Sequence, residues 1–101
     1  MRNTVLVADD SREIVRMIAD ELERENFGVL CAYDGKQALQ AMMDKHVDSL
    51  ILDIMMPGMD GLEVCRRLGN ERNIPILLLS ARDREMDRII GLEVGQRAGL
   101  S

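Results

Sequence analysis

Three aspartates follow short apolar runs, and their types and spacing suit the binding of a hard cation. Asp9 and Asp10 come directly after Thr4-Val5-Leu6-Val7-Ala8, and Asp53 comes directly after Ser49-Leu50-Ile51-Leu52. Runs this short and this rich in aliphatic residues are typical of buried parallel strands. Carboxylates gathered at the ends of such strands repel one another, and Mg²⁺, which prefers oxygen ligands, relieves that repulsion. The pattern therefore predicts a magnesium site with one aspartate left to do chemistry.

The elements that must position these acids alternate between strand and helix. Strands are expected over about residues 4–8, 28–33, 49–53 and 76–79. Helices are expected after each strand: one capped by Asp10 or Ser11 and ending near 25–26, one striped by Ala38, Leu39, Met42 and Met43, a short one carrying Leu62, Cys65 and Leu68, and one starting near Asp83. This alternation predicts βαβ units and a parallel sheet.

Composition limits the size, the location and the partners of the chain. At 101 residues it forms one small domain, and its net charge of −5 argues against direct contact with nucleic acid. No stretch approaches the ~18 apolar residues that a membrane span needs, and the N-terminus shows no signal-peptide pattern. We therefore expect a cytoplasmic chain without membrane contact. Cys31 and Cys65 fall in apolar segments and are expected to be buried and reduced.

Several motifs, in the same order and at similar separations, resemble those of response-regulator receiver domains from two-component signalling. They are Asp9-Asp10, the run LILDIMMPGMDG over residues 50–61, and LLSA over residues 78–81. Residues 87–95 also resemble the fourth helix of receivers attached to winged-helix DNA-binding domains. The similarity covers residues 3–95, so a receiver-like domain over 1–95 and an atypical tail over 96–101 are expected. It implies a flavodoxin-like, doubly wound α/β fold with strand order 2-1-3-4.

The resemblance also implies roles for individual residues. Asp53 would accept a phosphoryl group from a sensor histidine kinase, and this would switch an output interaction of the transcriptional kind. Mg²⁺, or Mn²⁺ or Ca²⁺ in its place, would be held by Asp10 directly, by Asp9 through water, by Asp53 and by the backbone carbonyl of Met55. Ser80 matches the hydroxyl residue that turns to hydrogen-bond the phosphoryl group. On this interpretation the chain is a phosphoacceptor signalling domain and not an enzyme.

The chain departs from the family at its C-terminal end. Receivers normally add a fifth helix and a fifth strand that ends in a lysine, whereas the two lysines here, Lys36 and Lys45, both fall in the second helix. We expect about four βα units with the fifth strand and helix missing. One face and one edge of the sheet would then be exposed, which favours self-association or exchange of elements.

Two alternative functions remain open. The absent lysine favours a phosphorylation-impaired binding or decoy fragment that holds metal and kinase. An aspartate-nucleophile phosphatase is the other alternative, but such enzymes usually place a second acid two residues after the nucleophile, where this chain has Met55.

Overall fold

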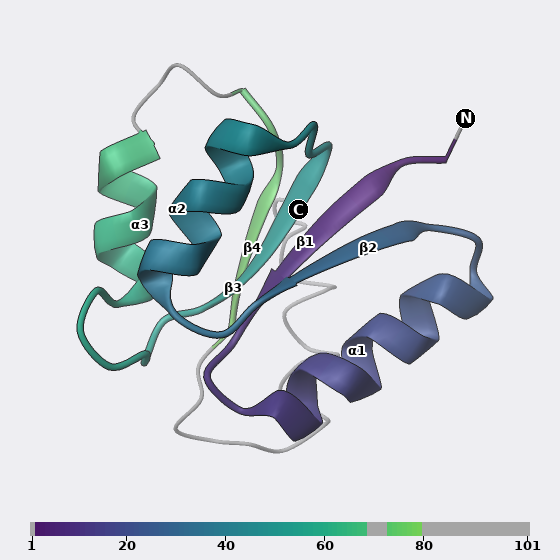
Figure 1. Ribbon diagram of the computed structural model, residues 1–101, viewed down its shortest axis with the longest axis horizontal. Coiled ribbons are helices and arrows are strands. Elements are labelled where there is room, and N and C mark those ends of the chain that lie inside the picture. The colour runs from purple at the N-terminus through teal and green to yellow at the C-terminus, as the bar shows by residue number, and fades with distance from the viewer. Residues whose placement is uncertain (1, 69–72, 80–101) are drawn as a thin grey trace.

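The computed structural model describes residues 2–68 and 73–79, which form a four-stranded parallel sheet with helices on both faces (Figure 1). The strands are β1 (Thr4–Ala8), β2 (Gly28–Ala32), β3 (Ser49–Asp53) and β4 (Ile76–Leu79), and the sheet order is β2-β1-β3-β4. The helices are α1 (Arg12–Arg24), α2 (Gly35–Asp44) and α3 (Gly61–Leu68). The expected doubly wound parallel sheet and its strand order are confirmed. The fourth helix expected near Asp83 lies outside the described residues.

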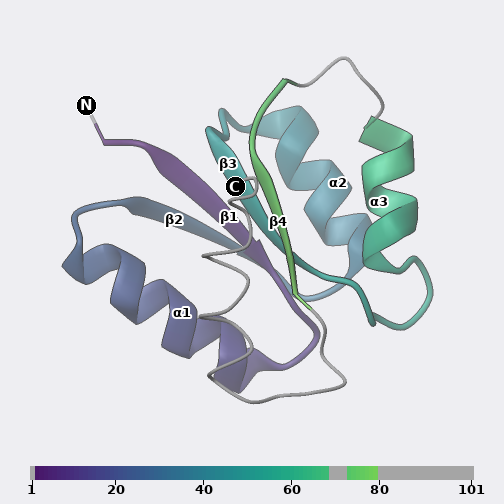
Figure 2. The same ribbon diagram turned by 180° about the vertical axis from the view of Figure 1, so that it is seen from behind.

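The strand order reverses beside β1, because β2 and β3 lie on opposite sides of it. The chain passes from β1 to β2 on one side and then crosses to β3 on the other, so β1 pairs with both neighbours. Helix α1 covers one face of the sheet, and α2 and α3 cover the other (Figures 1 and 2). Ligands of doubly wound sheets bind beyond the carboxyl ends of the strands at such a reversal.

Side chains that alternate along the strands build one apolar cluster on each face. Leu6, Leu50 and Leu52 point to the face that carries α2 and α3, where they pack with Met42 and Val64 in the larger cluster. Val5 and Val7 point to the opposite face and pack against Val15 of α1. The alternation follows from the two-residue period of a strand, and burial on both faces explains why the strands are almost wholly apolar.

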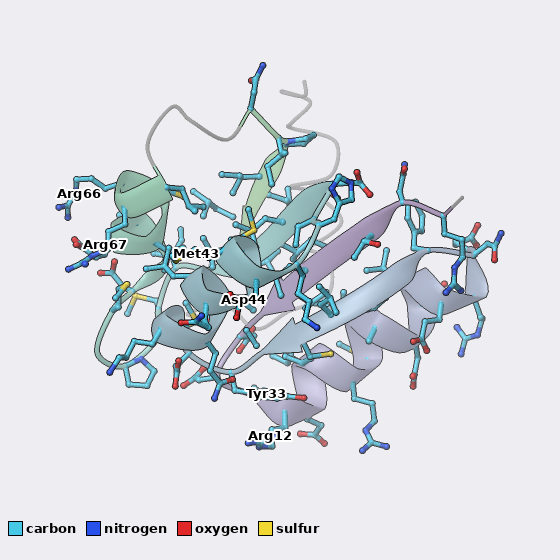
Figure 3. All side chains as sticks on the ribbon, turned by 45° about the horizontal axis from the view of Figure 1, so that its top comes forward. Arg12, Tyr33, Met43, Asp44, Arg66 and Arg67 are labelled. Carbon is cyan, nitrogen blue, oxygen red and sulfur yellow. The ribbon has the colours of Figure 1, made fainter. Side chains whose placement is uncertain are left out.

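Short polar contacts fix the starts of the first two helices. Ser11 is the N-cap of α1 and its hydroxyl accepts from the N–H of Ile14 at 3.3 Å. Asp34 caps α2 by accepting from the N–H of Gln37 at 2.8 Å. The guanidinium of Arg12 lies 4.0 Å from the centre of the Tyr33 ring, which joins the first turn of α1 to the segment after β2 (Figure 3).

Hydrogen bonds of Asp48 form a clamp that joins the start of β3 to the start of β1, at the amino ends of these strands. Asp48 Oδ2 accepts from the N–H of Thr4 at 2.7 Å, and the N–H of Asp48 donates to the carbonyl of Thr4 at 2.8 Å. His46 lies 2.9 Å from the second oxygen of Asp48. The Thr4 hydrogen bond, opposed in part by burial and aided by His46, holds the pKa of Asp48 below its usual value.

The structure corrects three expectations about which side chains are buried. Cys31 is exposed, because β2 is one of the two edge strands of the described sheet. In α2, Met42 is buried but Met43 is 71% exposed. In α3, Val64 and Leu68 face the core, whereas Leu62 is 54% exposed.

Candidate acidic site

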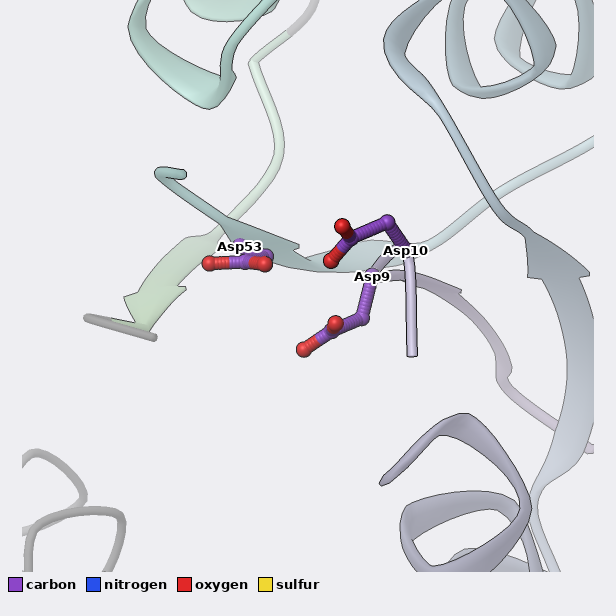
Figure 4. A group of neighbouring side chains, drawn as sticks. All are labelled: Asp9, Asp10 and Asp53. Atoms are coloured by element: carbon purple, nitrogen blue, oxygen red, sulfur yellow. The ribbon is translucent and has the colours of Figure 1, made fainter. Parts of the chain in front are cut away.

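The structure brings the three aspartates together at the carboxyl end of the sheet. Asp53 is the last residue of β3, and Asp9 and Asp10 follow β1 directly. The parallel register pairs Ala8 with Leu52, so the next residue of each strand, Asp9 and Asp53, comes to the same edge. One carboxylate oxygen from each aspartate lies within 4.8 Å of the others (Figure 4).

The three carboxylates differ in burial and in hydrogen bonding. Asp53 is fully buried and Asp9 is 3% exposed, whereas Asp10 is exposed. Asp53 Oδ1 accepts from the N–H of Met55 at 3.0 Å, and Asp9 Oδ1 accepts from the N–H of Ser11 at 2.9 Å. The second oxygen, Asp53 Oδ2, is buried and has no hydrogen-bond partner within the described part of the chain. A buried polar atom left unpaired costs about 1–3 kcal/mol, so this oxygen is poised to meet a ligand.

Burial and mutual repulsion shift the protonation of the two inner acids. Burial, chiefly, and the negative charges of Asp9 and Asp10 raise the pKa of Asp53 to about 7, against the lowering effect of the Met55 N–H. Burial also raises the pKa of Asp9, while the N–H of Ser11 opposes that rise. A bound cation would favour the charged forms of both acids and relieve the repulsion between them.

These residues fit a small hard cation. All the side-chain donors are carboxylate oxygens, which Mg²⁺ prefers, and the exposed Asp10 leaves one side of the cluster open to water, which Mg²⁺ usually keeps in its coordination shell. The side chains of the nearby methionines carry soft thioethers, which suit such a cation poorly. The orphaned Asp53 Oδ2 is the observation that a ligand would explain.

The loop that follows β3 is held against the site at its base. We call residues 54–60 the acceptor loop. The N–H of Gly61 donates to the carbonyl of Ile54 at 2.9 Å, and a Cβ on Gly61 would lie 2.5 Å from the carbonyl oxygen of Asp53. Only glycine allows α3 to begin this close to the strand that carries Asp53. Gly58 has a φ of 76°, which lets the loop turn back toward α3.

The described residues do not include one expected site residue, Ser80, and they contain one contact near the site that was not expected. Ser80 lies outside the described residues, so its side chain is not placed relative to Asp53. Sequence reasoning did not single out the contact between Gly35 and Met59 of the acceptor loop. Its only sequence signal was a glycine at the first position of a helix, just after the capping aspartate.

Fold and site together define a class of protein: a doubly wound α/β domain with an acidic cluster at its switch point. Residues 5–101 match the profile of the response regulator receiver domain. The chain therefore belongs to the receiver domain family of two-component response regulators. The matched range includes residues 96–101, which the sequence motifs did not cover.

Individual relatives agree with this assignment. The response regulator GtcR of Aneurinibacillus migulanus is 44% identical over 95 residues, a span that covers 94% of this chain and 39% of GtcR. The chain thus spans about two-fifths of the length of that relative. The receiver domain of the Francisella response regulator 1452 superposes with a TM-score of 0.75 at 35% identity, covering 93% of this chain and 78% of that one.

A third relative has been solved with a ligand and with a partner. The response regulator TrrA of Thermotoga maritima in complex with Mg²⁺-BeF is similar, with a TM-score of 0.74 at 32% identity, covering 84% of this chain and 75% of that one. TrrA in complex with the histidine kinase ThkA matches with a TM-score of 0.72 at 35% identity, covering 78% of this chain and 69% of that one. In the described part of the present chain, no helix is long and apolar enough to cross a membrane.

Proposed function

We propose that the chain accepts a phosphoryl group on Asp53 from the phosphohistidine of a sensor histidine kinase. A carboxylate oxygen of Asp53 attacks phosphorus, the bond between phosphorus and the imidazole nitrogen breaks, and the freed nitrogen takes up a proton. Asp9, Asp10, Asp53 and the backbone carbonyl of Met55 are the proposed ligands of Mg²⁺, with Mn²⁺ or Ca²⁺ as substitutes. A bound Mg²⁺ neutralises charge on the phosphoryl oxygens.

The protein's own contribution is to position the nucleophile. The Met55 N–H fixes Asp53 Oδ1, and Oδ2, which has no partner in residues 2–68 and 73–79, is the candidate attacking atom. Asp9 is held by Ser11, so it stays beside Asp53 despite the repulsion between them. Holding the reacting groups in line supplies much of the catalysis in phosphoryl transfer. We assign Ser80, by its place after β4, as the hydroxyl that binds the transferred group.

The single observation that carries this proposal is the buried Asp53, which is clustered with two other carboxylates and whose Oδ2 has no hydrogen-bond partner among the described residues. A purely structural aspartate at the end of a strand would pair both of its oxygens, because the cost of leaving one unpaired is not recovered elsewhere. The complex of TrrA with Mg²⁺-BeF supports the choice of cation, and the complex of ThkA with TrrA supports the choice of partner.

Intact mass spectrometry tests the proposal directly. The chain is incubated with Mg²⁺ and a small phosphodonor, beside an Asp53→Asn variant that keeps the shape of the side chain. We expect one phosphoryl group on the wild-type chain, none on the variant, and none when a chelator removes the metal. Uptake on the variant would place the acceptor elsewhere, and no uptake on a folded wild-type chain would refute the proposal.

A binding module that holds metal and kinase without completing the transfer is the second candidate. Lys36 in α2 and Lys45 at its C-cap are the only lysines of the sequence, and neither follows a strand end as the family's phosphoryl-binding lysine does. The two candidates separate in one experiment: the binding module takes up Mg²⁺ and competes for the kinase but gains no mass.

The remaining proposals concern the setting of the domain. We infer a cytoplasmic receiver unit over residues 1–95 whose phosphorylation changes a transcriptional output, without direct contact between this chain and nucleic acid. Ile51 and Ile76 of the sheet are only partly covered, and Ile76 is 37% exposed. These partly covered residues support self-association or exchange of elements. Size-exclusion chromatography showing a compact monomer at micromolar concentration would contradict that inference.

A further inference from the structure

A close approach between α2 and the acceptor loop lies outside the acidic cluster. Gly35, the first residue of α2, is buried against Met59. A Cβ at position 35 would lie 2.8 Å from Met59 Cβ and 3.1 Å from its Cγ, and it would also collide with the Met59 carbonyl oxygen. Carbon atoms in contact normally lie about 3.5–4.0 Å apart, so any side chain at position 35 forces one segment to move by about 1 Å.

The first turn of α2 is the segment that resists such a movement. Asp34 caps it through the N–H of Gln37, and the side-chain carbonyl of Gln37 in turn accepts from the N–H of Tyr33 at 2.8 Å. Ala38, one turn further along, is fully buried in the larger apolar cluster. Displacing this turn would break the two hydrogen bonds and open the core beneath it.

The acceptor loop is fixed at its base but less firmly at its far end. Ile54 is held by the N–H of Gly61, and Met56 is 5% exposed and packs into the larger cluster. Met59 is only partly buried, and a Cβ placed on Gly58 before it would have no neighbouring atom within 4 Å. A push at Met59 is therefore taken up by the loop rather than by α2.

We propose that Gly35 is a positioning residue for phosphoryl acceptance. Because Gly35 has no side chain, Met59 packs directly against the first turn of α2, and this contact keeps the acceptor loop in the position that places Met55 beside Asp53. The inference rests on the proposed function of Asp53. Met55 donates its N–H to Asp53 Oδ1 and lies four residues before Met59 in the same short loop. A shift of the loop would therefore change the position of Asp53 through this hydrogen bond. It would also move the Met55 carbonyl, the proposed ligand of the cation.

The test compares Gly35→Ala with Gly28→Ala. Both variants add one methyl group at the start of an element, but the nearest atom to a Cβ at position 28 would be Thr4 Oγ1 at 3.4 Å, an ordinary contact. Since a misplacement of about 1 Å can lower a rate by about 100-fold, we expect phosphorylation of Gly35→Ala to slow at least about tenfold. The Mg²⁺ concentration for half-maximal rate should rise as well. Gly28→Ala should match the wild-type chain in both measurements.

Two further readouts separate positioning from a general loss of stability. In metal-free ¹H–¹⁵N spectra the Met55 amide signal should shift in Gly35→Ala but not in Gly28→Ala. The double variant Gly35→Ala/Met59→Gly, which removes two of the three close contacts, should recover part of the rate and return the Met55 signal toward its wild-type position. A Gly35→Ala variant with the wild-type rate and the wild-type Met55 signal would overturn the proposal.

The role of Gly35 can still be tested if Gly35→Ala folds poorly or if the wild-type chain is not phosphorylated. If Gly35→Ala does not fold, Met59→Gly alone removes the side chain that packs against Gly35. An unchanged Met55 signal with unchanged Mg²⁺ affinity in that variant would then overturn the inference. Should the wild-type chain accept no phosphoryl group, the proposed function falls. The Met55 signal and the Mg²⁺ affinity would still decide the role of Gly35.

Discussion

The raised pKa of Asp53 makes a testable statement about the stability of the metal-free protein. Replacing Asp53 with Asn removes a charge that is fully buried, while the amide oxygen can still accept from the N–H of Met55. The new amide group lies among the carboxylates of Asp9 and Asp10, which can accept from it, and the substitution removes one negative charge from the cluster. We therefore expect Asp53→Asn to be more stable than the wild-type chain at neutral and alkaline pH.

The size of the effect follows from proton linkage. The pKa of Asp53 rises from 3.8 to about 7 on folding, a difference of about 3 pH units, and each unit corresponds to about 1.36 kcal/mol. The folded wild-type chain binds more protons than the unfolded chain between these values, so its stability falls as the pH rises through this window. The advantage of Asp53→Asn should be about 4 kcal/mol at pH 8, about 2 kcal/mol at pH 5 and below about 1 kcal/mol at pH 4.

Urea unfolding followed by far-UV circular dichroism measures this difference. Both proteins are unfolded at pH 4, 5 and 8 in the presence of a chelator, and the two free energies are compared at each pH. Adding Mg²⁺ at pH 8 should then stabilise the wild-type chain selectively, since a ligand that binds only the folded state shifts its stability by mass action. A stability difference that does not change with pH, or an Asn variant less stable than wild type at pH 8, would refute the assignment of a buried, unneutralised charge.

Two further substitutions test the core and the acceptor loop. Leu52→Ala, at a fully buried position of β3, should lower the free energy of unfolding by about 2–5 kcal/mol in the same urea assay, and a loss below 1 kcal/mol would mean that the cluster collapses around the cavity. Gly58→Ala should cost only about 1–2 kcal/mol, because the φ of 76° strains any L side chain while no atom lies within 4 Å of the new Cβ; equal stability of the two proteins would contradict this reading.

The sheet and the gathering of the acids were predictable because they depend on local patterns. Short aliphatic runs that end in aspartate identify buried parallel strands, and parallel strands present their carboxyl ends at one edge. The resemblance to receivers then supplied the order of the strands. The unequal burial of Asp9 and Asp10 was not predicted, because it depends on the turn that Ser11 makes into α1.

The buried face of α3 shows where sequence periodicity stops being informative. A helix of eight residues has about two turns, so Leu62, Cys65 and Leu68 fit a helical stripe as well as Gly61, Val64 and Leu68 do. The choice between them is made by Gly61, which must lie against the backbone of Asp53. Such a contact joins segments that no local pattern relates, and the contact of Gly35 with Met59 escaped prediction for the same reason.

The two ends of β3 respond to acid in opposite directions. Asp48, just before the strand, has a lowered pKa and supports the fold until protonation releases its clamp on Thr4. Asp53, at the far end, opposes the fold until protonation removes its charge. As the pH falls, mild acid first removes the destabilising charge of Asp53, and stronger acid then weakens the hydrogen bond between Asp48 and Thr4. Asp48, just before this five-residue strand, and Asp53, at its end, therefore together favour greatest stability of the metal-free domain on the acidic side of neutrality.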